Sequence, residues 1–73
     1  MKKSEWLKNL AKNLVKERKR LNFSQQKLAE KARLSLATVT RIEQGSIENP
    51  TLDTLEALGR ALKKADPLEL LKK

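Results

Sequence analysis

Four side chains near the middle of the chain have the chemistry needed to read the edges of DNA bases. They are Leu36, Ala37, Thr40 and Arg41. An arginine can donate two parallel hydrogen bonds to guanine, a threonine hydroxyl can bond a base edge, and small apolar groups can contact thymine methyl groups. In a helix these residues share one side, while Val39 and Ile42 lie on the opposite side. Plainer explanations remain: Leu36 could pack back onto the domain, and Thr40 and Arg41 could be ordinary surface residues.

Two short helices separated by a tight break would position this set. Apolar periodicity predicts them at about residues 25–32 and 36–44. Ser24 and Ser35 stand where N-cap residues belong, because their hydroxyls can accept hydrogen bonds from free backbone N–H groups. Gly45 stands where a helix ends in a left-handed residue. The segment therefore has the punctuation of a helix-turn-helix, which by itself is common in small helical bundles.

The remaining apolar residues predict three more helices, at about residues 5–20, 52–63 and 67–72. Ser4 is the expected cap of the first of these. The chain contains no strand pattern, internal repeat or low-complexity linker. We expect an all-α fold, a compact five-helix domain with one core, as a single domain that spans residues 1–73.

Some residues have a predicted structural role within these helices. Leu52 and Gly59 are assigned to the inner face of the fourth helix. Glycine costs about 1 kcal/mol relative to alanine inside a helix, so Gly59 predicts the close approach of another segment. Asn22 is expected to end the first helix in a left-handed conformation. Trp6 is assigned to the core by its helical spacing, with base stacking or partner binding as the alternative.

The composition favours a binding protein over an enzyme. Lysines and arginines number 17 and acidic residues 9, for a formal net charge of +8. Basic residues concentrate in the first 21 positions, where the only acidic residues are Glu5 and Glu17. This balance favours a polyanionic partner, although many small lysine-rich proteins are basic for solubility alone.

Two residue types that serve catalysis and metal binding are absent from the sequence. It has no cysteine and no histidine, so it lacks disulfides, thiolate ligands, the usual general base and the commonest metal ligand. We expect no enzymatic activity, metal or cofactor. No apolar run approaches the roughly 18 residues of a membrane span, and no signal peptide is visible. We expect no membrane association and a cytoplasmic location.

The spacing of the core and turn residues resembles the phage repressor and Cro-type (XRE-like) helix-turn-helix DNA-binding family. The shared frame consists of Gln25, Ala29, Leu34, Val39, Ile42, Glu43 and Gly45, with Arg18 and Leu21 upstream and the run Asn49, Pro50, Thr51 and Leu52 downstream. The resemblance covers roughly residues 7–62. It implies a lambda-repressor-like fold in which residues 25–44 form the helix-turn-helix.

The resemblance also implies how this chain contacts double-stranded DNA. The helix at 36–44 would lie in the major groove, and Leu36, Ala37, Thr40 and Arg41 would read bases. Contacts to phosphates and the DNA backbone would come from Gln25, Gln26, Ser35, Thr38, Gln44, Arg18 and Lys16. An ion pair between Arg18 and Glu43 would join the first and third helices and orient the reading helix.

Two positions depart from the family pattern. Arg33 occupies a turn position where the family often has glycine, and a left-handed arginine costs about 1 kcal/mol. Glu48 lies in the loop that usually faces a phosphate strand, and this loop has no cation. The cations that bind phosphates would then come from elsewhere, from Lys16, Lys27, Lys31 or the N-terminal lysines.

By the same resemblance, the leading hypothesis is a transcriptional repressor that acts as a homodimer on a palindromic operator. A dimer surface could include Leu68, Leu70 and Leu71, which cannot all face the core of one short helix. Two alternatives remain open. One is the antitoxin of a toxin–antitoxin pair that regulates its own operon and binds a toxin through another face. The other is a protein-interaction module with no DNA target.

Overall fold

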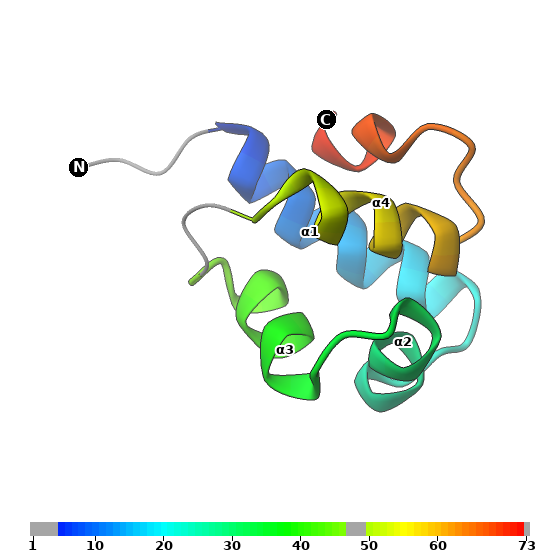
Figure 1. The fold of residues 1–73 in the computed structure, drawn as a ribbon. Coiled ribbons are helices and arrows are strands. Elements are labelled where there is room, and N and C mark those ends of the chain that lie inside the picture. Colours follow the sequence, from blue (N-terminus) through cyan, green and yellow to red (C-terminus); the bar gives the residue numbers. More distant parts are fainter. Residues whose placement is uncertain (1–4, 47–49, 73) are drawn as a thin grey trace.

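The computed structural model describes residues 5–46 and 50–72, and all regular structure in these ranges is helical (Figure 1). The elements in chain order are α1 (Glu5–Arg20), α2 (Gln25–Ala32), α3 (Leu36–Gln44), α4 (Leu52–Ala61) and the 3-10 helix η1 (Pro67–Leu71). The all-α class is confirmed, and the first three helices have the predicted bounds. The fourth helix is shorter than predicted, and the last segment is a 3-10 helix. Ser4 and Glu48 lie outside the described residues.

Three hydroxyl side chains begin three of the helices. Ser24, Ser35 and Thr51 each have an extended backbone, and each side chain accepts a hydrogen bond from the backbone N–H three residues later. These bonds satisfy donors that have no partner within the helix. The helices of the helix-turn-helix therefore begin where local side-chain chemistry requires.

A left-handed residue follows each of the four α-helices. Gly45 has a φ of 73°, and three non-glycine residues in the described ranges also have a positive φ: Asn22 (60°), Arg33 (58°) and Lys63 (61°). For Arg33 the sequence left open a strained left-handed turn or a different turn, and the structure has the left-handed one. Asn22 was expected in this conformation, whereas Lys63 was not. Its backbone N–H donates to Arg60 O at 3.2 Å, and the next N–H donates to Gly59 O at 2.8 Å. This turn stops α4 at Ala61, two residues before the predicted end.

One core joins all five elements. Its members with almost no exposed surface are Leu10, Leu14, Leu28, Val39, Leu58, Leu62 and Leu70. The assignment of Leu52 to this core was wrong, because its side chain is 69% exposed. Leu52 is the first residue of α4, and the buried face of that helix begins at Leu55. Trp6 is only half-buried and is not among the core residues.

The helices are arranged so that α2 packs against both α3 and α4, while α1 packs against α3 and η1 (Figure 1). The predicted close approach at Gly59 is made by Pro67 of η1. A Cβ added at Gly59 would lie 2.9 Å from Pro67 Cβ. Side-chain amides of α1 also hold η1: Asn9 donates to Leu71 O at 3.0 Å, and Asn13 donates to Leu70 O at 2.9 Å.

The placement of η1 corrects one part of the predicted dimer surface. Leu70 is 1% exposed and belongs to the core, so it was wrongly included. In a 3-10 helix, side chains three positions apart lie on the same face. Leu70 therefore shares the inner face with Pro67, and Leu68 shares the next face with Leu71. Leu68 is 48% exposed and Leu71 is half-buried.

Candidate nucleic-acid interface

The exposed face of α3 carries the four residues that were predicted to read bases. The opposite face is anchored by Val39 and Ile42, which are 0% and 3% exposed. Leu36 is 43% exposed, so it does not pack back into the core. Ala37 and Arg41 are also exposed, and Thr40 is half-buried. The helix lies at one edge of the molecule, and its outer side is not covered by any other described segment (Figure 1).

Two hydroxyl groups lie at the N-terminus of α3. The Ser35 hydroxyl accepts a hydrogen bond from the backbone N–H of Thr38 at 3.1 Å. The hydroxyl oxygens of Ser35 and Thr38 also lie 2.8 Å apart, at hydrogen-bond distance. A hydroxyl has one donor and two acceptor positions, so each of these two hydroxyls can form a further hydrogen bond to a bound ligand. The N-terminus of a helix carries partial positive charge, which suits an approaching phosphate.

A buried polar network ties α3 to α1 and α2. Arg18 donates two hydrogen bonds to the Glu43 carboxylate, from Nε at 2.7 Å and from Nη2 at 3.1 Å. The Gln25 amide donates to the same carboxylate at 2.9 Å. Exposure is only 13% for the Arg18 side chain and 5% for that of Glu43. Glu43 therefore accepts hydrogen bonds from two other helices and fixes the position of α3 against both.

The network limits what Arg18 and Gln25 can offer to a phosphate. Arg18 Nη1 donates to Phe23 O at 2.9 Å, so every guanidinium nitrogen already has a partner within the protein. One N–H of the Gln25 amide is likewise directed at Glu43. The resemblance implied the pair of Arg18 and Glu43, but the contribution of Gln25 was not predicted. That bond depends on the orientation of α2 against α3, which a sequence pattern does not contain.

The other residues predicted to contact phosphates lie around this network. Gln26 is exposed at the start of α2, where its amide donates to Glu30 Oε2 at 3.2 Å. Gln44 is exposed at the end of α3. Lys16 is exposed on α1 and lines an open depression of about 370 Å³ that also includes Glu43. The predicted backbone-contacting residues thus come from three helices that meet at Glu43.

A second polar cluster escaped the sequence analysis. Glu17 is 8% exposed on the inner face of α1, and its carboxylate lies 2.6 Å from Arg20 Nε and 3.4 Å from Lys64 Nζ. The hydrogen bond from Arg20 lowers the pKa of Glu17, and Lys64 lowers it further, against the opposing effect of burial. The sequence could have predicted the burial of Glu17, because its spacing from Leu10 and Leu14 places it on the same face of the helix.

The described part of the chain has neither a metal-binding cluster nor a membrane-spanning helix. Residues 5–46 and 50–72 contain no group of three potential ligands that could hold a metal ion. None of their helices has both the length and the apolar character needed to cross a membrane.

Comparison with known proteins agrees with the geometry of α2 and α3. A protein-family model described as helix-turn-helix matches residues 14–70, which is more than half of the chain. No curated protein and no solved structure matches the chain significantly. The matched region contains the buried network at Glu43, both helices of the motif, and α4. The chain therefore belongs to the phage repressor and Cro-type (XRE-like) helix-turn-helix family, whose members are DNA-binding transcription regulators.

Proposed function

We propose that this protein is a sequence-specific transcriptional repressor that binds a palindromic operator as a homodimer. The observation that carries the proposal is the exposed face of α3. Its side chains have base-reading chemistry, while Val39 and Ile42 anchor the helix to the core from the opposite face. A helix of this kind fits the major groove of B-form DNA.

Non-specific affinity would come from phosphate contacts around α3. The N-termini of α2 and α3 can bind phosphates through backbone N–H groups, with Gln26, Ser35 and Thr38 beside them. Lys16 would add a cation from α1, and Gln44 a polar group at the other end of α3. Such contacts fix the register of the protein on DNA and make its affinity fall steeply with salt.

Sequence readout would come from the middle of α3. We propose that Arg41 binds guanine O6 and N7 and that Thr40 bonds a neighbouring base edge or phosphate. Leu36 and Ala37 would contact thymine methyl groups. Arg18 and Gln25 would act mainly by holding Glu43, because their polar atoms are already directed at it. The network would then keep the reading helix in one orientation, which is the condition for discriminating between bases.

The homodimer would place two copies of α3 in successive major grooves, about 34 Å apart. Leu68 and Leu71, which share a face of η1, are the proposed centre of the dimer surface. Binding of such a dimer across a promoter would exclude RNA polymerase, which is the basis for proposing repression.

The experiment that tests this proposal is the selection of bound duplexes from a random-sequence pool. We expect an enriched inverted repeat whose half-site centres lie about one helical turn apart. The matched control is a selection with Arg41→Gln, which should lose the preference at one base pair of each half-site. A pool with no enriched motif would contradict sequence-specific binding, and a single unrepeated half-site would contradict the dimer.

A further inference from the structure

A second cationic surface lies where the C-terminal ends of α2 and α4 meet. Lys31, Arg60 and Lys63 line an open depression of about 380 Å³ together with Ala61. No carboxylate of the described residues lines it. The ion pairs found among the described residues join Arg18 to Glu43, and Arg20 and Lys64 to Glu17, so they include none of these three cations.

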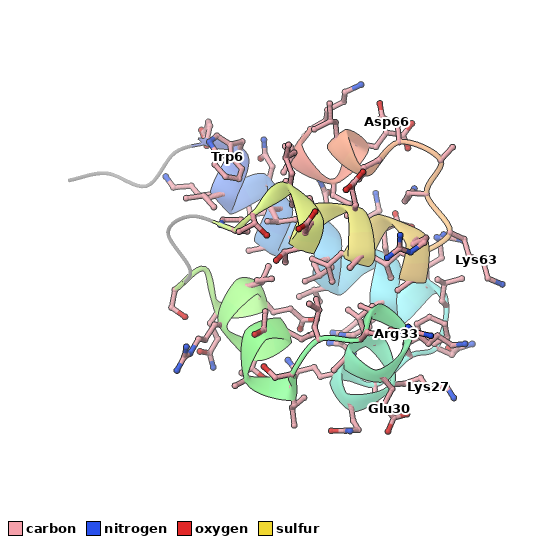
Figure 2. All side chains as sticks on the ribbon, viewed as in Figure 1. Trp6, Lys27, Glu30, Arg33, Lys63 and Asp66 are labelled. Carbon is pink, nitrogen blue, oxygen red and sulfur yellow. The ribbon has the colours of Figure 1, made fainter. Side chains whose placement is uncertain are left out.

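This depression is separate from the reading face of α3. The depression is lined by residues of α2, of α4 and of the turn after α4, and α2 also packs against α3. Figure 2 shows Lys63 at the end of α4, on the side of the molecule away from α3. A straight duplex seated along the outer side of α3 would therefore leave Lys63 uncovered.

A cation–π contact directs one of the three side chains, and the turn that ends α4 places another. Lys31 Nζ lies 5.5 Å from the centroid of the Phe23 ring, a cation–π distance that directs its side chain. Lys63 adopts a left-handed conformation that glycine adopts without strain. A cation near a helix C-terminus does interact favourably with the helix dipole. That effect accounts for each cation separately, but it does not account for three cations around one depression whose described lining holds no carboxylate.

The lining of the depression indicates the chemistry of its partner. Among the described residues, Ala61 is the only lining residue without a charge, whereas the centre of a protein–protein interface is typically depleted of charged residues. Phosphate oxygens of nucleic acids are instead contacted mainly by lysine and arginine side chains. Like charges held together repel one another, and a polyanion would relieve this repulsion.

We propose that this depression binds the phosphate backbone of a second DNA duplex while α3 occupies its operator. The identity of the polyanion rests on the proposed DNA-binding function, whereas the existence of the cationic site does not. One protein molecule could then bridge two DNA segments, and a dimer would carry two such depressions.

Amide NMR spectroscopy of the operator complex tests this inference. The operator is the duplex selected from the random pool, and the second probe is a short unrelated duplex. The first addition should shift the amide signals of α3. The second should shift those of Lys31, Arg60 and Lys63 and leave the α3 signals at their operator-bound positions. Unchanged signals at the three cations would overturn the proposal.

A matched pair of variants separates a local site from general charge. K31Q/K63Q removes two cations from the depression, and K8Q/K19Q removes two exposed cations from α1. For the second duplex, K31Q/K63Q should reduce the slope of log affinity against log salt concentration by about 1.8, the value for two lost phosphate contacts. K8Q/K19Q should change the slope by much less. Equal effects of the two variants would contradict a defined site, and equal melting temperatures would show that both fold.

Two further results distinguish the proposals from each other. If an oligoglutamate peptide shifts the signals at the depression and the second duplex does not, the partner is an acidic protein and the proposal fails. If duplex DNA shifts the signals at the depression but never those of α3, phosphate binding at this site is supported and the proposed reading function is contradicted.

Discussion

Arg41 is the only cation on α3, and its side chain projects from the exposed face. A guanidinium group can donate two parallel hydrogen bonds to guanine, whereas a lysine acts as a single point charge. The proposed role of Arg41 is therefore one of geometry as well as charge.

Replacement of Arg41 by Lys tests this role without changing the net charge. We expect the affinity for the selected operator to fall about 5- to 150-fold, corresponding to about 1–3 kcal/mol for a lost bidentate contact. Affinity for unrelated DNA and the melting temperature should change little, because the side chain is exposed. Titrations by fluorescence anisotropy measure both affinities, with Lys19→Arg as a control. An equal loss on operator and unrelated DNA would show that Arg41 contacts phosphate only.

The pair of Arg18 and Glu43 predicts a loss of stability when one partner is removed. Arg18→Met leaves the Glu43 carboxylate largely buried without its cation. We expect a loss near the lower end of the ~3–5 kcal/mol that follows from breaking a buried pair, because Arg18 keeps some exposure to water. The double variant R18M/E43L should recover most of this loss, since an apolar pair replaces an ionic one. Urea unfolding measures both, and an equally unstable double variant would refute the argument.

The element that most depends on close packing is η1, which α1 and α4 hold in place. The Asn9 and Asn13 amides bind its carbonyl groups, and Gly59 lies directly beneath Pro67. This segment contributes the buried side chain of Leu70 to the core. A change at Gly59 is therefore felt by an element outside its own helix.

We expect Gly59→Ala to destabilise the protein, although alanine is the better helix former. The added Cβ would lie 2.9 Å from Pro67 Cβ, so η1 must shift. Overpacking of this kind costs about 1–3 kcal/mol, against a gain of about 1 kcal/mol in helix propensity. The melting temperature should therefore fall. Adding Pro67→Gly removes the clashing Cβ, so the two changes should be less than additive. A rise in melting temperature for Gly59→Ala alone would contradict the described packing.

The helix boundaries show which elements a sequence can predict. Serine and threonine N-caps and the stops at Asn22 and Gly45 are local signals, so α1, α2 and α3 were placed correctly. The left-handed residue at Lys63 was missed, because lysine carries no preference for positive φ. The exposure of Leu52 was not predicted, because it depends on which turn of α4 first packs against the core, and this is set by the position of the other helices.

At the scale of the whole molecule, Glu17 links the start of the fold to its end. Its carboxylate contacts Arg20 on α1 and Lys64 in the segment after α4. The lowered pKa of Glu17 means that the folded protein favours the ionised carboxylate. This contribution is present above the ordinary glutamate pKa of about 4.3 and is lost as the pH falls through the lower pKa of the folded state.

Thermal unfolding between neutral pH and about pH 3 measures this linkage. The wild-type protein should lose melting temperature as the pH falls below about 4.3. Glu17→Gln should be less stable at neutral pH and should show a weaker pH dependence in this range. Glu56→Gln, an exposed carboxylate on α4, is the matched control and should keep the wild-type pH dependence. Parallel curves for wild type and Glu17→Gln would show that this group does not contribute.

The candidate site was predictable only where it depends on one helix. The spacing of Val39 and Ile42 was enough to separate the buried face of α3 from the exposed face. The bond from Gln25 to Glu43 and the cationic depression at Lys31 and Lys63 each require two elements to be placed against each other. Long-range packing, which no local spacing encodes, creates both.

The structure of the protein bound to its selected operator tests the central claim most directly. The account predicts that α3 lies in the major groove, with Arg41 and Thr40 facing base edges. The network of Arg18, Gln25 and Glu43 should keep the hydrogen bonds that it has in the free protein. A complex in which the outer face of α3 points away from the bases, with DNA bound elsewhere on the molecule, would contradict it.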